Sequence, residues 1–222
     1  MSQLTPTQNV AVDLIILGYD FELNSVRVYV PRRTNEYLNG ERALPGVLLR
    51  HGEFLSAGVQ RALRTKTQLD IAESSYILQE LPAQADPGRD ERGHVIFIPI
   101  LVFTKLRVEK LNDDHWLEFS PGLELAFDHT RMVNLGYEVI SNNILHNPLP
   151  LLMFPELVTL VDVKNVIAHF DARFTHVLPS NFKTMFPTDK FLEETDLLLQ
   201  TNQKGRHPRL YRLAEKAIKK IF

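Results

Sequence analysis

The residues with the clearest chemical potential lie in residues 44–69, which read LPGVLLRHGEFLSAGVQRALRTKTQL. Glu53 supplies a carboxylate that could ligate a divalent cation, and such a cation activates water for attack on phosphorus. Mg²⁺ binds weakly through only one or two carboxylates, and Lys66 adds a positive charge to the same stretch. We therefore expect no metal site, either here or at the histidines, whose spacing gives no support for one.

The same stretch resembles the Nudix box, the loop-and-helix motif of hydrolases that act on nucleoside-diphosphate-linked compounds. Glu53 and Arg61 stand in register with the box, as do the preceding Leu-Pro-Gly and the apolar positions of the helix. The three glutamates that follow the box arginine are replaced by Ala62, Thr65 and Lys66. The resemblance implies that the fold is kept and the reaction lost, so we expect a binding protein that is not an enzyme. Glu53 is expected to pair with Arg61 and to order the loop against the helix.

The elements around this motif are expected to form a strand-rich first part. Apolar or alternating runs rich in β-branched residues predict strands over residues 10–18, 25–30 and 94–104. A turn at Asn24 joins the first two, and a helix over residues 53–67 presents on one face Leu55, Val59, Ala62 and Leu63. A second helix over residues 129–145 follows Asp128 as its N-cap, and the proline-rich stretch 147–155 connects it to a second domain.

The last part of the chain predicts two short helices and a hairpin. The first helix has Thr159 as its N-cap and carries on one face Val163, Val166, Ile167 and Phe170. The second covers residues 180–186 with Ser180 as its N-cap. Residues 195–201 and 206–213 then form a hairpin with an exposed basic strand. This order of elements is typical of a winged helix-turn-helix.

With both parts considered, the whole chain resembles the NrtR-like family of Nudix-related transcriptional regulators. The most specific residues are Asn181-Phe182 in the second short helix, and Gly205-Arg206 with Leu210-Tyr211-Arg212 in the hairpin. The resemblance implies an α+β chain. A Nudix-like α/β/α sandwich with a mixed sheet is expected over residues 1–150, and a winged helix-turn-helix domain over residues 151–222. It also implies a repressor that binds a double-stranded DNA operator and senses ADP-ribose or a related metabolite of the NAD pathway. Two operator half-sites require two copies, so a homodimer is expected.

An effector of this kind carries a diphosphate, and arginine side chains are its best donors because their planar forks match phosphate geometry. Five arginines stand at a strand end or in loops where they could reach a ligand: Arg32, Arg33, Arg50, Arg89 and Arg92. Loop arginines are also commonly solvated, so each of them could instead be ordinary surface. No cofactor is expected beside the effector.

Six residues are expected at the DNA: Asn181, Lys183, Lys204, Arg206, Arg209 and Arg212. The three arginines alternate along the exposed strand of the wing, with Leu210 and Tyr211 between them, where they could contact phosphates. Asn181 could bond adenine in the major groove, or it could bond the backbone at the helix start. The remaining lysines near the C-terminus are expected to be the solvated face of a docked helix.

Composition limits the other possibilities. The 222 residues are 44% hydrophobic and 23% charged, as in globular proteins, and their net charge of −2 does not by itself suggest nucleic acid. From Pro155 onward, however, 11 basic residues face 8 acidic ones, so the two parts differ in charge. The absence of cysteine excludes disulfides, zinc-thiolate sites and cysteine nucleophiles. With no secretory signal and no membrane-spanning run, a cytoplasmic protein that does not engage membranes is expected.

Three other functions stay open from the sequence. One is a regulator of the same family that answers to a sugar. Another is a metal-dependent Nudix pyrophosphohydrolase, which the residues in place of the box glutamates disfavour. The third is a binding or scaffold protein without DNA contact, which an acidic surface around Asn181 would favour.

Overall fold

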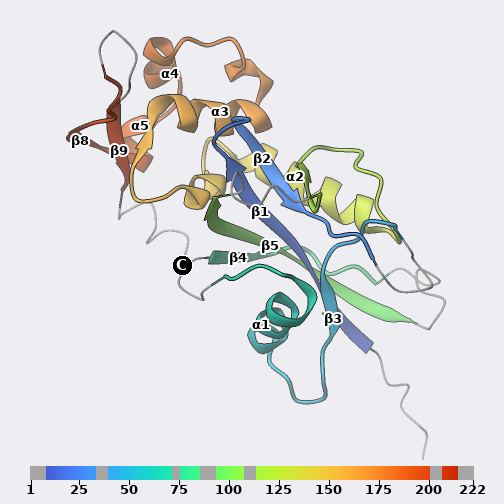
Figure 1. The fold of residues 1–222 in the computed structure, drawn as a ribbon. Helices are drawn as coiled ribbons and strands as arrows, with labels where there is room; N and C mark the ends of the chain where they lie inside the picture. The colour runs from blue at the N-terminus through green and yellow to red at the C-terminus, as the bar shows by residue number, and fades with distance from the viewer. Residues whose placement is uncertain are drawn as a thin grey trace, which may run out of the picture.

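The computed structural model describes residues 9–33, 40–71, 76–85, 94–107, 114–200 and 207–214 (Figure 1). Across these residues the larger sheet has six strands in the order β4-β5-β1-β2-β6, with β3 paired to β1. The strands are β1 (Asn9–Asp20), β2 (Ser25–Tyr29), β3 (Gly46–Leu48), β4 (Tyr76–Glu80), β5 (Val95–Arg107) and β6 (Trp116–Glu118). The three segments predicted as strands are confirmed as β1, β2 and β5.

Strand β1 is the central element of this sheet. It pairs in parallel with β5 and antiparallel with β2 and β3, which makes the sheet mixed. Successive side chains of a strand point to opposite faces, so Val12 and Leu14 enter one apolar core while Ile15 and Leu17 enter the other. Burial on both faces explains why β1 is an almost continuous apolar run. Asn24, with a φ of 53°, closes the predicted turn between β1 and β2.

One long helix covers each face of the sheet (Figure 1). Helix α1 (Leu55–Lys66) buries Gly58, Val59, Ala62 and Leu63. Helix α2 (His129–Asn143) follows Asp128 as predicted and buries His129, Met132, Val133, Gly136 and Ile140. Gly136 lets α2 approach closely, since a Cβ there would lie 3.2 Å from the side chains of Ile15 and Leu101. The predicted α/β/α sandwich is confirmed.

A smaller sheet in the order β7-β9-β8 belongs to the second part of the chain. Its elements in chain order are η4 (Leu149–Met153), β7 (Val158–Thr159), α3 (Leu160–Phe170), η5 (Ala172–Phe174), α4 (Pro179–Met185), α5 (Thr188–Phe191), β8 (Leu192–Leu198) and β9 (Arg209–Leu213). Helices followed by an antiparallel hairpin form the predicted winged helix-turn-helix. Helix α4 lies at the end of the molecule away from α1 (Figure 1).

The helix starts of this second part were predicted with mixed success. Thr159 caps α3 as predicted: its hydroxyl accepts the Asp162 N–H, and the Asp162 carboxylate accepts the Thr159 N–H. Ser180 is not the N-cap of α4, because that helix starts at Pro179 with Leu178 as its N-cap. Proline suits the first helical position, since its φ is already helical and no N–H is lost there.

The stretch predicted as a connection between domains is not an exposed linker. Residues 149–154 are buried, and Phe154 packs edge-on against Tyr19 of β1 at 5.1 Å between ring centroids. This stretch belongs to one continuous apolar cluster that includes side chains of both sheets. The boundary near residue 150 stays a prediction. No helix within the described ranges is both long and apolar enough to cross a membrane.

Candidate functional site

Glu53 and Arg61 form a two-point ion pair between the loop after β3 and helix α1. The Arg61 Nε donates to one carboxylate oxygen at 2.8 Å, and Nη2 donates to the other at 2.7 Å. The Arg50 backbone N–H also donates to Glu53, and Arg61 further donates to the Leu48 carbonyl at 2.8 Å. The donated bonds, first from Arg61 and then from Arg50, lower the pKa of Glu53 to about 2. The predicted pairing is confirmed, and it occupies both oxygens of this carboxylate.

The positions that the Nudix box fills with glutamates hold no carboxylate on α1. Ala62 is fully buried in the core, and the Thr65 hydroxyl donates back to the Arg61 carbonyl. Lys66 is exposed at the end of the helix. In the part of the chain that the structure describes, no three histidine or acidic side chains converge as metal ligands would. These residues therefore do not fit a divalent cation.

Two arginines share one carboxylate beside the end of β2. Arg32 Nε donates to one oxygen of Asp114 at 2.7 Å, and Arg42 Nη2 donates to the other at 2.6 Å. These bonds, Arg32 first, lower the pKa of Asp114. Arg42 also donates to the Val30 carbonyl and is mostly covered, whereas Arg32 stays half-exposed. The sequence interpretation missed Arg42, because nothing local indicates a partner 72 residues away.

Arg33 follows Arg32 in the chain, and its side chain is half-buried near Leu44 and Asp13. Its Nη2 donates to the Leu44 carbonyl at 2.6 Å, while its buried Nε has no hydrogen-bond partner among the described residues. Burial lowers the pKa of Arg33, and the nearby Asp13 carboxylate opposes that shift. A buried N–H without a partner is costly, so an additional acceptor at this point would be favourable.

The Leu-Pro-Gly segment is held in place by buried polar groups. The Leu44 N–H donates to His129 Nδ1 at 2.9 Å, and His129 Nε2 lies 3.9 Å from Asp13 Oδ1. Gly46 is required here because a Cβ would fall 2.0 Å from that Asp13 oxygen. Phe127, just before α2, is half-exposed, has a left-handed φ of 59°, and lies 5.3 Å from the His129 ring.

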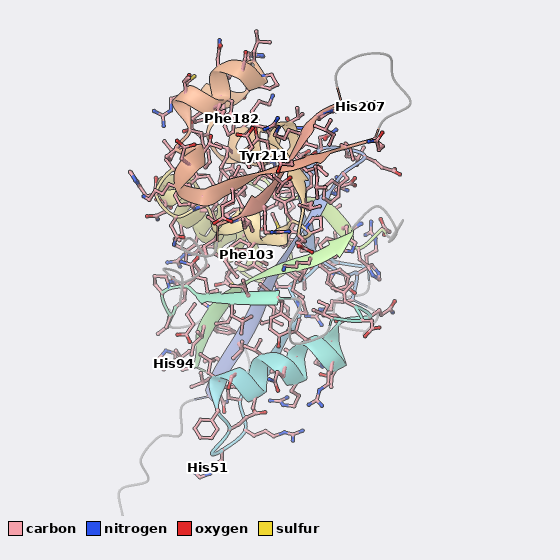
Figure 2. All side chains as sticks on the ribbon, turned by 90° about the vertical axis from the view of Figure 1, so that its left-hand side faces the viewer. His51, His94, Phe103, Phe182, His207 and Tyr211 are labelled. Carbon is pink, nitrogen blue, oxygen red and sulfur yellow. The ribbon has the colours of Figure 1, made fainter. Side chains whose placement is uncertain are left out.

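The second candidate surface is formed by α4 and the wing strands. Figure 2 shows Phe182 and Tyr211 at one end of the molecule and His51 at the other. Lys183 of α4 donates to Glu194 Oε2 at 2.9 Å, and Arg209 of β9 donates to Glu194 Oε1 at 2.6 Å. The Lys183 bond is the main cause of the lowered pKa of Glu194, and the same bond raises the pKa of Lys183.

Known proteins resemble this chain over nearly its whole length. No family model matches the chain. The ADPR responsive transcriptional repressor NtrR of Acinetobacter baylyi is 27% identical over 220 residues, which cover 94% of this chain and 83% of that protein. The structure of Shewanella oneidensis NrtR complexed with a 27mer DNA superposes with a TM-score of 0.74 at 20% identity, covering 95% of both chains. This chain has the architecture of the NrtR-like, Nudix-related regulators.

A second solved structure agrees with this NrtR-like architecture. It is a MutT/nudix family protein from Enterococcus faecalis, with a TM-score of 0.71 and 20% identity over 96% of this chain and 90% of that one. Both structural matches extend through the sandwich and the winged helix. The changes in the Nudix box therefore occur within a fold that is shared over nearly the whole chain.

The described arginines among those predicted to bind the effector lie in different surroundings. Arg32 and Arg33 lie with Arg42 at the end of β2. Arg50 is exposed on the loop between β3 and α1. Arg89 and Arg92 lie outside the described residues.

Four of the six residues predicted to contact DNA lie within the described part of the chain. Asn181, Lys183, Arg209 and Arg212 are exposed, whereas Lys204 and Arg206 lie outside the described residues. Arg209 and Arg212 are three residues apart on β9, and such positions point to opposite faces of a strand. Arg212 accordingly pairs with Glu156 at 2.8 Å and not with Glu194. The expectation of one alternating basic row is thus corrected to two separate ion pairs.

Proposed function

We propose that this chain is a DNA-binding transcriptional repressor whose Nudix-like domain, residues 1–150, binds ADP-ribose or a related metabolite without hydrolysing it. The observation that carries the proposal is a winged helix, built from described residues between 151 and 214, packed onto a Nudix-type sandwich. The relative from Acinetobacter baylyi, named as ADPR responsive, supports the same combination. An acidic surface around Asn181 would favour a scaffold protein, but α4 carries no acidic residue and the neighbouring Glu194 is paired with Lys183 and Arg209.

Binding without hydrolysis follows from the donors present. Both oxygens of Glu53 are bonded to Arg61. Helix α1 carries Ala62, Thr65 and Lys66 at the positions where metal-binding carboxylates would be needed. The arginines are suited to binding an anionic ligand, because guanidinium groups bind the oxygens of a diphosphate. Five are proposed to contact the effector: Arg32, Arg33, Arg50, Arg89 and Arg92. The buried Arg33 Nε supports this assignment, because it has no acceptor among the described residues and one that reached it would be favourable.

Contacts between the two parts provide a route for coupling. The Tyr137 hydroxyl of α2 donates to the His169 carbonyl of α3 at 2.6 Å. The His169 ring contacts the Phe119 carbonyl at 2.6 Å, and its burial lowers the pKa of His169. An effector that binds more tightly when α3 is in one position would change the fraction of molecules able to bind DNA. The size of this change is set by the difference between the effector's affinities for the two conformations. A homodimer is proposed because two half-sites require two winged helices.

The experiment is isothermal calorimetry on the full chain with ADP-ribose, AMP and ribose. We expect ADP-ribose to bind and Arg50→Gln to weaken it by about tenfold, as the loss of a charge-assisted hydrogen bond does. Arg64→Gln on the exposed side of α1 is the matched control and should bind as the native chain does. Binding of ribose without ADP-ribose would replace this effector by a sugar and leave the regulator proposal standing.

The DNA half of the proposal is tested separately by gel shift with the full chain and duplexes from the region upstream of its own gene. A duplex that shifts in the presence of excess random competitor DNA is the expected result. The absence of any specific shift would contradict the repressor.

A further inference from the structure

Helix α4 exposes one defined face because its other face is fixed by two aromatic rings. Phe182 and Phe186 are one helical turn apart, and both are buried. Their rings stack at 5.1 Å with an interplanar angle of 9°. Asn181, Thr184 and Met185 therefore point outward, and half of Met185 is exposed. Both views place α4 at the outer end of the molecule (Figures 1 and 2).

The hydrogen-bonding capacity of this face is concentrated in Asn181. The Thr184 hydroxyl donates to the Asn181 carbonyl at 2.7 Å, so it is used within the helix and leaves its methyl group outward. The side-chain contact of Asn181 is a long one, 3.4 Å from the Ser180 hydroxyl to Oδ1. Its side-chain amide thus keeps a donor and an acceptor for an external partner.

The one cation of α4 is directed away from this face. Lys183 reaches across to β8 and bonds Glu194, and its Nζ lies 5.9 Å from the centre of the Tyr211 ring. The helix has no arginine. Guanine is typically read by arginine or lysine through O6 and N7, and the one lysine of α4 is held by Glu194, so this face of α4 presents neither group.

Resting on the proposed DNA-binding function, we propose that α4 reads A·T base pairs in the major groove. The Asn181 amide would donate to adenine N7 and accept from the adenine N6 amino group, the two-point contact that asparagine makes with this base. The methyl groups of Thr184 and Met185 would contact the C5-methyl group of thymine. Lys183 and Arg209 lie beside this face, each paired with Glu194, and would contact phosphates that displace this carboxylate.

The experiment begins with selection of bound sequences from a randomised duplex pool by the full chain. The enriched half-sites are expected to contain A·T pairs at defined positions. When the same selection is made with Asn181→Ala, the preference for A·T at one or more of these positions should disappear. Modified duplexes then isolate single atoms. Replacing the adenine by 7-deazaadenine removes N7, and replacing thymine by uracil removes only the methyl group.

The native chain should lose roughly 5- to 100-fold in affinity on the 7-deazaadenine duplex, whereas Asn181→Ala should bind both duplexes almost equally. Met185→Ala should likewise lose the difference between thymine and uracil. Arg209→Ala is the control, since loss of a phosphate contact weakens all these duplexes alike. Circular dichroism melting confirms that each variant is folded.

Two results would overturn the assignment in distinguishable ways. One result is an enriched sequence that Asn181→Ala and Met185→Ala select unchanged, or G·C pairs at the positions where these variants differ from the native chain. Either outcome would contradict the reading of A·T pairs by α4 and leave DNA binding itself intact. A pool with no enrichment at all would contradict DNA recognition itself, and the proposed function with it.

Discussion

Glu53 and Arg61 are joined by two hydrogen bonds of 2.8 and 2.7 Å, and each side chain is less than one-fifth exposed. The pair fastens the loop after β3 to helix α1. Both residues stand in register with the Nudix box, so this pair belongs to the part of the motif that is kept, whereas the later glutamates are replaced by Ala62, Thr65 and Lys66. By bonding both oxygens of Glu53, Arg61 fixes the conformation of this loop.

The titration of Glu53 reports this pair directly. With its pKa lowered to about 2, the carboxylate stays charged, and its contribution to stability is complete above the ordinary value of 4.5. That contribution is lost as the pH falls from there through about 2. Carbon-detected NMR of the carboxyl group should show the low pKa in the native chain and a pKa closer to 4.5 in Arg61→Ala, in which only the Arg50 N–H still donates. A native Glu53 that titrates near 4.5 would contradict the pairing in solution.

Hydrolysis should be absent with either Mg²⁺ or Mn²⁺. Incubation with ADP-ribose should yield no AMP above a metal-free blank by chromatography, since three of the box carboxylates are replaced by Ala62, Thr65 and Lys66. Glu53→Gln is the control. Metal-dependent turnover that this substitution abolishes would show that the single carboxylate suffices.

Removal of the Glu194 carboxylate should strengthen DNA binding. Lys183 and Arg209 both donate to this side chain, so a phosphate must compete with it for the same cations. Glu194→Gln is expected to raise affinity for all duplexes and to steepen the slope of log K against log salt by roughly 1 to 2. Fluorescence anisotropy at several salt concentrations measures both quantities.

Glu193→Gln provides the matched control for that prediction. It makes the same change in net charge one residue away, on an exposed side chain. Equal effects of the two substitutions would mean that net charge, and not the release of Lys183 and Arg209, governs binding.

The two residues predicted as helix caps, Thr159 and Ser180, should contribute differently to the stability of the protein. Thr159→Ala removes a capping box and should lower the free energy of unfolding by about 1 kcal/mol. Ser180→Ala should change it by less than about 0.5 kcal/mol, because Ser180 lies inside α4 and caps nothing. Urea denaturation measures both, and an equal loss in the two variants would contradict the observed start of α4.

Local patterns predicted much of this structure. The helical spacing of Val59, Ala62 and Leu63 identified the buried face of α1, and the register of the Nudix box identified the Glu53–Arg61 pair. Each of these depends on residues close in sequence, where helix periodicity fixes the geometry.

Relationships between distant segments could not be predicted in the same way. Arg32 and Arg42 meet Asp114 only because of how β2 and β6 are placed in the sheet. Glu194 reaches Arg209 across a hairpin whose register shifts between Glu194 and Leu198, so counting along the strands does not find the pair. The sequence therefore predicted which cations were available but not which carboxylates hold them.

The coupling between effector and DNA is measured most directly by fluorescence anisotropy of the full chain on a selected duplex, with and without saturating ADP-ribose. We expect a change in Kd for DNA of roughly 5- to 150-fold. By linkage, saturating DNA should change the affinity for ADP-ribose by the same factor. An identical Kd for DNA in both conditions, while calorimetry shows ADP-ribose bound, would contradict an effector-controlled repressor.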